Sequence, residues 1–310
     1  MGYLEEDVWC VSNGFNINQV GAYDRPKSLF RDFISYNHSN YKPEVNRYHL
    51  YVSYACPWAH RTLIMRHLKQ LHSIVSVSVV MPDMLENGWE FGSNFSHSTH
   101  DHINQFNYLY EVYKHAKKDC TCRVTVPVLF DKKTHTIVNN ESSDIIRIFN
   151  SAFNEFTNNY DDYYPQDLSD EIDNINEVIY HSINNGVYKV GFAQQQAVYD
   201  EAVSKLFNQL DYLEEYFKSH LFLVGNKLTE ADIRLVPTLL RFDSVYHTHF
   251  KCNQKQLRNY SNLYEYVRKI YDLSAVKETT FYSHIIRHYY YSHNMINPFQ
   301  IIPVCPNPIF

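Results

Sequence analysis

A cysteine and a proline stand between a predicted strand and a predicted helix, and this junction constrains the fold more than any other feature of the chain. Residues 48–54 (YHLYVSY) are aromatic and β-branched, as strands are. Pro57 suits the first position of a helix, because its missing N–H needs no partner there. Residues 74–80 alternate valine with serine and predict a second strand. The order strand–helix–strand requires a parallel pair with a right-handed crossover.

The segments that follow extend this unit. The pattern predicts helices and strands over four further segments: a helix over 103–117, strands over 124–130 and 134–138, and a helix over 142–149. Ser142 or Ser143 is the expected N-cap of the last helix. The order β-α-β, α, β-β-α is the layout of an α/β thioredoxin-like domain. Residues 1–46, with two prolines, are expected to be irregular.

The second half of the chain lacks a strand pattern and predicts an all-α domain. A helix through Ile183 is expected to end at Gly186, and residues 229–232 (TEAD) are typical of an N-terminal capping box. A further helix is expected over 260–271, and an extended tail over 296–310. The predicted organisation has four parts: an N-terminal extension (1–46), a thioredoxin-like domain (47–150), a linker (151–169) and a helical domain with an extended tail (170–310).

Composition and charge exclude several classes of protein. The net charge of −6 argues against a nucleic-acid scaffold, which usually carries a basic face. The longest apolar run, near residues 74–81, falls short of the roughly 18 residues of a membrane helix. Six cysteines in 310 residues are too few for a disulfide scaffold, and MGYLEEDVWC lacks the features of a signal peptide. We therefore expect a cytoplasmic protein without membrane or nucleic-acid partners.

Cys56 is the candidate nucleophile. A helix N-terminus offers unpaired N–H groups and a partial positive charge, and both favour the thiolate, which is the reactive form of cysteine. The motif reads Cys-Pro-Trp-Ala, and Ala59 cannot act as a resolving thiol. This excludes a dithiol cycle within the motif and leaves a one-thiol cycle that an external thiol resolves. The alternative is that Cys56 is a buried core residue.

Three further positions suit a peptide ligand with charged ends. A cis Pro127 beside the cysteine would leave the backbone groups of Val126 open to a peptide; a trans proline on an edge strand is the alternative. Glu141 and Ser142, at a helix start, suit an α-amino acid end such as the γ-glutamyl group of glutathione. Arg123 is a candidate for the other carboxylate, with a lone surface arginine as the alternative.

Together these residues resemble the glutathionyl-hydroquinone reductases, the xi class of glutathione transferases. The matching stretches are YHLYVSYACPWAHRTLI (48–64), ENGWEF (86–91), RVTVPVLFDK (123–132), NNESSDIIR (139–147), NGVYKVGFA (185–193), RHYYYSH (287–293) and INP (296–298). The resemblance implies a thioredoxin-like N-terminal domain, a helical C-terminal domain and a homodimer. The chain departs from the family at Cys122 and Cys305, where the family usually has glycine.

The resemblance also implies a reaction, the glutathione-dependent reduction of S-glutathionyl-hydroquinones to hydroquinones, with glutathione as co-substrate and no metal. Cys56 would attack the thioether sulfur and form a mixed disulfide that a second glutathione resolves. Tyr188 matches the family's proton donor and acceptor. Tyr246 and Tyr289 match tyrosines that hydrogen-bond the thiolate, with Tyr290 as the neighbouring alternative to Tyr289. The implied glutathione-binding positions are Trp89, Arg123, Val124, Thr125, Val126, Glu141 and Ser142.

Two other functions use the same residues. An omega-like thioltransferase or dehydroascorbate reductase would also employ Cys56, whereas a non-catalytic binding module on the same fold would have no need of a reactive thiol. Residues 120–122 (CTC) are a weak signal for a metal or redox pair. The spacing of His97, His100 and His102 matches no helical metal-ligand motif.

Overall fold

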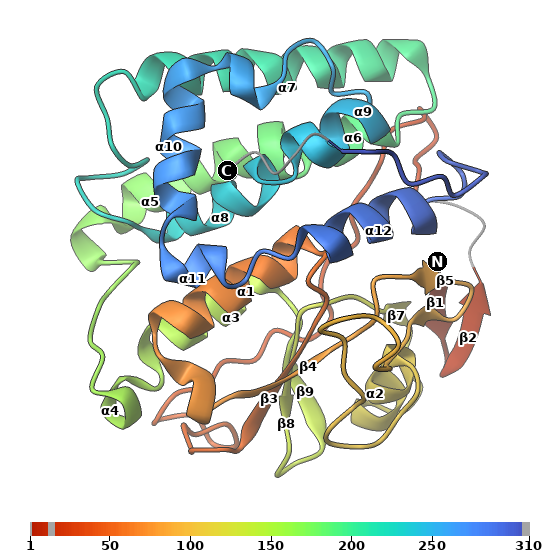
Figure 1. The fold of residues 1–310 in the computed structure, drawn as a ribbon. Helices are drawn as coiled ribbons and strands as arrows, with labels where there is room; N and C mark the ends of the chain where they lie inside the picture. Colours follow the sequence, from red (N-terminus) through yellow and green to blue (C-terminus); the bar gives the residue numbers. More distant parts are fainter. Residues whose placement is uncertain (1, 12–15, 306–310) are drawn as a thin grey trace. The chain divides into compact units, whose positions relative to one another are not determined.

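The structure is a computed structural model that describes residues 2–11 and 16–305 (Figure 1). Contacts within the chain group these residues into two compact units. The sheet unit comprises the described parts of Met1–Gly14, Pro26–Asp161 and Thr279–Ser292. The helical unit comprises the described parts of Phe15–Arg25, Asp162–Glu278 and His293–Phe310. The division into an extension, a domain, a linker and a second domain at residues 46, 150 and 169 stays a prediction.

A four-stranded mixed sheet with the order β4-β3-β8-β9 forms the centre of the sheet unit. Its strands are β3 (Tyr48–Val52), β4 (Ser76–Val79), β8 (Val128–Asp131) and β9 (Thr136–Asn139). β3 runs parallel to β4 and antiparallel to β8, and β9 runs antiparallel to β8. Every residue of β3 is buried, as expected for a central strand. This arrangement confirms the predicted thioredoxin-like fold.

The helices of the sheet unit follow the strands directly. α1 (Pro57–Leu68) follows β3, and α3 (Ser142–Ser151) follows β9; the two helices pack against each other beside the sheet (Figure 1). α2 (Leu109–Ala116) lies against β9. The shorter elements are η1 (Leu71–Ser73), β5 (Met84–Leu85), β6 (Gly88–Trp89) and α4 (Asn154–Thr157).

α12 (Tyr282–Ser292) also belongs to the sheet unit, although it lies far along the chain. The guanidinium of Arg287 donates two hydrogen bonds to the carboxylate of Asp83, at 2.7 and 2.8 Å. The Nδ1 of His288 lies 2.8 Å from the carbonyl oxygen of Pro82. These contacts attach α12 to the segment that follows β4.

The prediction that residues 1–46 are irregular is wrong for residues 2–11, whereas residues 16–46 contain neither a helix nor a strand, as predicted. β1 (Gly2–Glu5) and β2 (Val8–Val11) form an antiparallel hairpin, and β1 also pairs with β7 (Cys122–Arg123). The hairpin turn is Glu6-Asp7, with φ of 47° and 65°. Positive φ at both turn residues is typical of the tight turn that joins two strands, but Asn-Gly or Asp-Gly usually marks it. Glu-Asp gives no such signal, so the sequence did not reveal the hairpin.

α2 and β8 begin later than predicted, and the N-cap of α3 differs from the prediction. α2 begins at Leu109 rather than at residue 103, because the carboxylate of Asp101 accepts the N–H of Ile103 at 2.9 Å and holds a loop there. β8 begins at Val128 rather than at residue 124, since Pro127 has no N–H to donate to the sheet. Glu141, and not either following serine, is the N-cap of α3.

The helical unit confirms the predicted all-α architecture. Its elements are η2 (Gln166–Leu168), α5 (Ser169–Ile179), η3 (Tyr180–Asn184), α6 (Gly186–Gly191), α7 (Gln196–Tyr216), α8 (Glu230–Leu239), η4 (Phe242–Tyr246), α9 (His247–His249), η5 (Leu257–Asn259), α10 (Ser261–Tyr271) and α11 (Ser274–Lys277). η3 and η4 are π-helical turns.

Two local predictions in the helical unit have different outcomes. The capping box is confirmed, because the carboxylate of Asp232 accepts the N–H of Thr229 at 2.9 Å at the start of α8. The helix end at Gly186 is wrong: a π-helical turn follows α5, and Gly186 begins α6. Residues 301–305 of the predicted tail form neither helix nor strand, and 306–310 lie outside the described residues.

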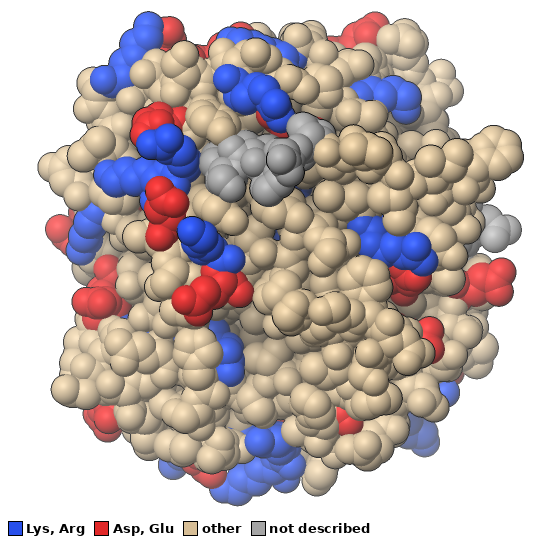
Figure 2. Space-filling view, in the orientation of Figure 1, with Lys and Arg blue, Asp and Glu red and all other residues tan. Residues whose placement is uncertain are grey.

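Two observations concern the surface and the possibility of a membrane span. On the face shown in Figure 2, Lys and Arg side chains lie close to Asp and Glu side chains. Within residues 2–11 and 16–305, none of the helices combines the length and the apolar character needed to cross a bilayer.

Candidate active site

Three segments of the sheet unit meet at one edge of the central sheet. β3 and β9 both run antiparallel to β8, so their C-terminal ends lie at the same edge as the N-terminal end of β8. Cys56 follows β3, Val126 precedes β8, and Glu141 follows β9. The topology therefore gathers the three residues that carry the sequence prediction.

Cys56 is the N-cap of α1, with φ −76° and ψ 122°. Its side chain is half-buried, and the Sγ donates to the carbonyl oxygen of Val126 at 3.6 Å. The Cys56 N–H donates to the carbonyl oxygen of Ser53 at 3.2 Å, which fixes the backbone ahead of the helix. The Val126–Pro127 peptide is cis, as predicted. The thiol thus lies at a helix N-terminus and beside the loop that precedes β8.

Glu141 presents a carboxylate at the N-terminus of α3. The carboxylate accepts the N–H of Ser143 at 3.1 Å and the hydroxyl of Ser28 at 3.0 Å. Burial raises the pKa of Glu141, but these hydrogen bonds and the positive charge of Arg61 outweigh it and hold the pKa below its usual range. Ser142 is buried, and its Oγ accepts from the Arg61 guanidinium at 3.4 Å. The site therefore holds a fixed negative charge.

The segment from Arg123 to Val126 runs from β7 to the cis peptide. Arg123 pairs with Tyr3 of β1 and is half-buried. The hydroxyl of Tyr113 donates to the carbonyl oxygen of Thr125 at 2.8 Å. Val124 and Val126 are buried. Contacts to neighbouring elements therefore fix the course of this segment at both ends.

Trp89 belongs to the same unit, but its side chain is mostly enclosed. Its exposed fraction is 6 %, and its ring stacks on that of His288 with centroids 4.8 Å apart. Tyr289 and Tyr290 follow His288 on α12 and are both buried. Trp89, Tyr289 and Tyr290 thus lie in the unit that contains Cys56.

The other two predicted tyrosines lie together in the helical unit. Tyr188 is on α6, Tyr246 is the last residue of η4, and their ring centroids are 6.0 Å apart. Tyr188 follows one π-helical turn, η3, and Tyr246 ends another. Such turns are rare and occur frequently at functional sites.

Aromatic rings from distant parts of the chain surround Tyr188. Its ring contacts those of Phe192 at 5.8 Å and Phe250 at 5.4 Å. The guanidinium of Arg25 lies 4.9 Å from the centre of the Tyr188 ring and donates to the amide oxygen of Asn185 at 2.9 Å. We name these five residues the Tyr188 cluster.

Sequence analysis missed Arg25 and Ser28, which contact predicted site residues. Both lie in the segment that was expected to be irregular, where no periodic pattern marks a functional position. Ser28 bonds a carboxylate 113 residues away, and Arg25 an amide 160 residues away. Only a structure reveals pairs so far apart in sequence.

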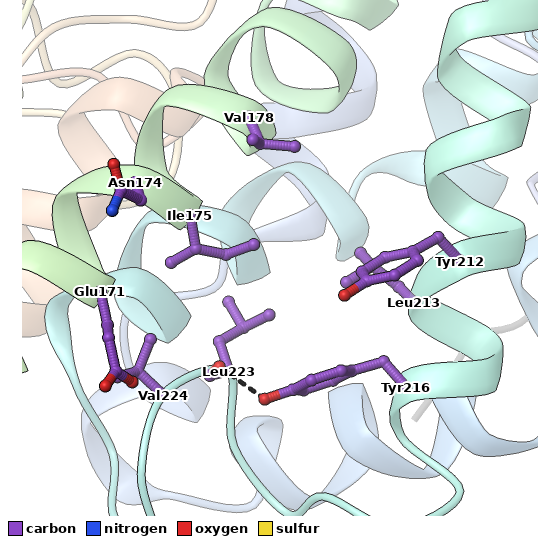
Figure 3. Close-up of a pocket in the computed structure, with 9 residues that line it drawn as sticks. All are labelled: Glu171, Asn174, Ile175, Val178, Tyr212, Leu213, Tyr216, Leu223 and Val224. Carbon is purple, nitrogen blue, oxygen red and sulfur yellow. Dashed lines mark hydrogen bonds between the residues drawn. The ribbon is translucent and has the colours of Figure 1, made fainter.

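A surface pocket in the helical unit lies away from these residues. It has a volume of about 340 Å³ and is lined by α5, α7 and residues 223–224 (Figure 3). Ile175, Tyr212 and Tyr216 point into it, and the Tyr216 hydroxyl donates to the carbonyl oxygen of Leu223 at 2.9 Å. None of the predicted site residues lines this pocket.

The thiols of Cys120 and Cys122 meet in the sheet unit, with Sγ atoms 3.4 Å apart. In the part of the chain that the structure describes, no three or more His, Cys, Asp or Glu residues gather as metal ligands would.

Comparison with known proteins agrees with both units. Residues 55–152 match the family model described as glutathione S-transferase, N-terminal domain, and residues 196–269 match glutathione S-transferase, C-terminal domain. The chain is thus similar to two-domain glutathione S-transferases along both of its halves.

Relatives that match over almost the whole chain indicate which class of glutathione S-transferase it resembles. Glutathionyl-hydroquinone reductase YqjG of Escherichia coli (strain K12) is 49 % identical over 313 residues, which cover 99 % of this chain and 95 % of the relative. Glutathionyl-hydroquinone reductase PcpF of Sphingobium chlorophenolicum is 46 % identical over 308 residues, which cover 99 % and 96 %.

Solved structures agree. The glutathione-bound structure of YqjG superimposes with a TM-score of 0.87 at 51 % identity, covering 89 % of this chain and 92 % of that one. The glutathione-S-transferase Xi from Phanerochaete chrysosporium gives a TM-score of 0.91 at 48 % identity, covering 93 % and 98 %. The chain belongs to the glutathionyl-hydroquinone reductase family, the xi class of the glutathione S-transferases.

Proposed function

We propose that this protein catalyses the glutathione-dependent reduction of S-glutathionyl-hydroquinones to free hydroquinones, with Cys56 as the nucleophile. The observation that carries the proposal is the position of Cys56. Its thiol lies at the N-terminus of α1, 3.6 Å from the carbonyl oxygen of Val126 and at the sheet edge where Glu141 offers a carboxylate. A thiol without a partner cysteine in its motif suits a cycle that external glutathione completes.

The substrate is held through its glutathionyl part. Glu141 accepts the ammonium of the γ-glutamyl end, and Ser142 and the N–H groups at the start of α3 bind its carboxylate. The backbone of Val126 pairs with the cysteinyl part of glutathione, and Arg123 binds the glycyl carboxylate. Trp89, Val124 and Thr125 complete the binding positions. These contacts place the thioether sulfur opposite Cys56 Sγ.

The first chemical step breaks a carbon–sulfur bond. Carbon leaves poorly unless the ring first shifts to a keto tautomer, and Tyr188 exchanges the proton that this shift requires. The Cys56 thiolate then attacks the sulfur of the thioether and forms a disulfide with glutathione. The electron pair of the broken bond goes to the ring, which regains its aromatic hydroquinone form. Tyr246 and Tyr289 donate hydrogen bonds that stabilise the thiolate.

The second step regenerates the enzyme. A second glutathione attacks the mixed disulfide, releases Cys56 and forms glutathione disulfide. In total, one S-glutathionyl-hydroquinone and one glutathione give one hydroquinone and one glutathione disulfide. External glutathione carries out this step, because the motif has Ala59 in place of a second thiol.

Replacing the nucleophile tests the proposal directly. With glutathionyl-menadiol as substrate, Cys56→Ala is expected to lower the rate of menadiol release by about 10³-fold or more, because no group in the motif can replace the thiolate. Mass spectrometry of the native protein, quenched with acid, should show a glutathione adduct on the tryptic peptide that carries Cys56. A Cys56→Ala protein that keeps its activity would contradict the mechanism.

The test also separates the proposed reaction from omega-like thioltransfer. A thioltransferase would reduce low-molecular-weight mixed disulfides at Cys56 without releasing menadiol. Rapid disulfide reduction with no cleavage of glutathionyl-menadiol would therefore favour the omega-like activity. A chain inactive on both substrates would favour a binding module.

We also infer a homodimer, from the resemblance to the family, and a cytoplasmic location, from the sparse use of cysteine. Light scattering of the purified protein measures its mass, and a monomer at micromolar concentration would contradict this inference. Fractionation of cells that express the protein tests the location.

A further inference from the structure

A second pair of thiols lies in the sheet unit and takes no part in the mechanism above. Cys120 and Cys122 flank Thr121, and their Sγ atoms are 3.4 Å apart. A disulfide bond is about 2.05 Å long, so the two sulfurs need to approach by only about 1.4 Å. We propose that Cys120 and Cys122 form a dithiol site that glutathione disulfide oxidises to an intrachain disulfide.

The N-terminal hairpin holds the backbone of this site. The carboxylate of Asp7 accepts the N–H of Cys120 at 2.8 Å, and the N–H of Asp7 donates to the carbonyl oxygen of Cys120 at 3.2 Å. The N–H of Glu6 donates to the hydroxyl of Thr121 at 3.0 Å, and Cys122 pairs with Leu4 of β1. These contacts fix the backbone of all three residues of the motif and hold the two thiols next to each other.

The two thiols differ in exposure, and this difference assigns their order of reaction. Cys122 is half-buried, whereas Cys120 is fully buried. A glutathione disulfide molecule can therefore reach only Cys122. Cys120 lies behind it, in position to attack the sulfur of a mixed disulfide on Cys122. The geometry matches an entry thiol and a resolving thiol.

The electrostatics favour the second step of this order, the attack by Cys120, rather than the first. The S–H of Cys122 donates toward Cys120 and lowers the pKa of the Cys120 thiol, although burial opposes this. The same hydrogen bond and burial raise the pKa of Cys122. The pair therefore keeps its first negative charge mainly on Cys120. Once Cys122 carries glutathione, the resolving sulfur is the one that ionises more readily.

The chemistry balances with glutathione disulfide as the oxidant. Cys122 first passes its proton to Cys120 across the 3.4 Å contact; the Cys122 thiolate then attacks one sulfur of glutathione disulfide, forms a mixed disulfide and releases one glutathione thiolate. The Cys120 thiolate then attacks Cys122 Sγ, forms the intrachain bond and releases the second glutathione. Two electrons pass from the cysteines to glutathione disulfide, and the two cysteine protons end on the two released thiolates. The reverse reaction reduces the site with glutathione.

This inference rests on the proposed function in one respect: the proposed reaction produces glutathione disulfide, which is the oxidant of the dithiol site. It is therefore tested with added glutathione disulfide in the full-length Cys56→Ser protein, which cannot turn over. Failure of the proposed function leaves this test unaffected. Trypsin is expected to cut after Lys118 and Arg123, so that one short peptide, residues 119–123, carries both thiols.

In excess glutathione disulfide, this peptide is expected to lose the mass of two hydrogen atoms and to carry no glutathione. Cys120→Ser should instead accumulate a glutathione adduct on Cys122, because the resolving thiol is missing. In Cys122→Ser, Cys120 should carry roughly tenfold less glutathione than Cys122 carries in Cys120→Ser, because the remaining thiol is buried. Cys252 is a matched internal control: it is a buried thiol of the helical unit whose pKa burial raises, and it should stay reduced.

Three outcomes would overturn the inference. The first is a fully reduced 119–123 peptide at glutathione disulfide concentrations that modify the half-buried Cys10. The second is a stable glutathione adduct on Cys122 while Cys120 is present. The third is equal modification of the two single variants. The first two readouts use the unaltered Cys120–Cys122 pair, so they hold even where a single variant folds poorly.

Discussion

The two units hold their candidate residues in different ways. In the sheet unit, Cys56, Val126 and Glu141 lie at strand ends and helix N-termini, where backbone hydrogen bonds set their positions. In the helical unit, Tyr188 and Tyr246 are positioned by contacts between rings. Where backbone hydrogen bonds fix a residue, its backbone stays in place when its side chain is substituted. A packed ring depends on the volume of its neighbours.

This difference predicts two ways in which substitutions lower activity: by removing a chemical group or by disturbing packing. Substitutions at the sheet edge should remove a chemical group and leave the fold intact. Substitutions around Tyr188 should act through packing, unless they remove only its hydroxyl. Three substitutions test the comparison, beyond the loss of activity expected for Cys56→Ala.

The largest effect is expected for Tyr188→Phe, which removes the hydroxyl and keeps the ring. Loss of a general acid or base costs about 10²-fold or more. We expect the rate of menadiol release from glutathionyl-menadiol to fall by about that factor. The rate of thioltransfer to a simple mixed disulfide should stay within about twofold, because that reaction needs no carbon protonation.

The control for this prediction is Tyr212→Phe, which removes the hydroxyl of an exposed tyrosine on α7. It should leave both rates unchanged. Equal losses on both substrates in Tyr188→Phe would contradict a role in carbon–sulfur cleavage.

A smaller effect is expected for Gly191→Ala at the end of α6, through packing. A Cβ at Gly191 would lie 2.3 Å from the Cγ of Phe250 and 2.7 Å from its Cβ. Phe250 belongs to the Tyr188 cluster, so the cluster must shift. Overpacking of this kind costs about 1–3 kcal/mol, and the free energy of unfolding in urea should fall by that amount.

Gly186→Ala at the start of α6 is the matched control. Its Cβ would meet the carbonyl oxygen of His181 at 3.6 Å, an ordinary contact. Because alanine gives the unfolded chain less conformational entropy than glycine does, the substitution should stabilise the protein by about 0.4–1 kcal/mol. Equal destabilisation by the two substitutions would show that the cluster around Phe250 is not the sensitive region.

The smallest effect is expected for Glu141→Gln. The substitution replaces a charged acceptor by a neutral one of the same shape, and the loss of about 1.4 kcal/mol corresponds to about tenfold weaker glutathione binding. Calorimetric titration with glutathione measures it. Glu155→Gln, at an exposed carboxylate of α4, should bind like the native chain.

The same carboxylate predicts a pH dependence. The pKa of Glu141 lies below its usual range in the folded protein, so its contribution to stability is present above the unfolded-state pKa of about 4.3 and is lost as the pH falls through the folded value. Native binding should therefore stay constant from pH 7 to about pH 5. A tenfold loss of native affinity within that window would contradict an anionic Glu141.

Local patterns in the sequence predicted what the backbone determines. The strand–helix junction at Cys56, the capping box at Thr229 and the order of strands and helices along the chain depend on residues close together in the sequence. The N-terminal hairpin escaped prediction because its Glu-Asp turn carries no usual signal. The contact of Arg25 with the Tyr188 cluster escaped because it joins residues 160 or more positions apart.

The placement of α12 has a consequence for how the protein is made. The sheet unit takes its last helix from residues 282–292, after the chain has built α5 to α11 of the helical unit. During synthesis, the Trp89 ring therefore cannot stack on that of His288 until almost the whole polypeptide has left the ribosome. No single proteolytic cut yields an intact sheet unit, and a nascent chain that stops before residue 279 would lack the partner of Trp89.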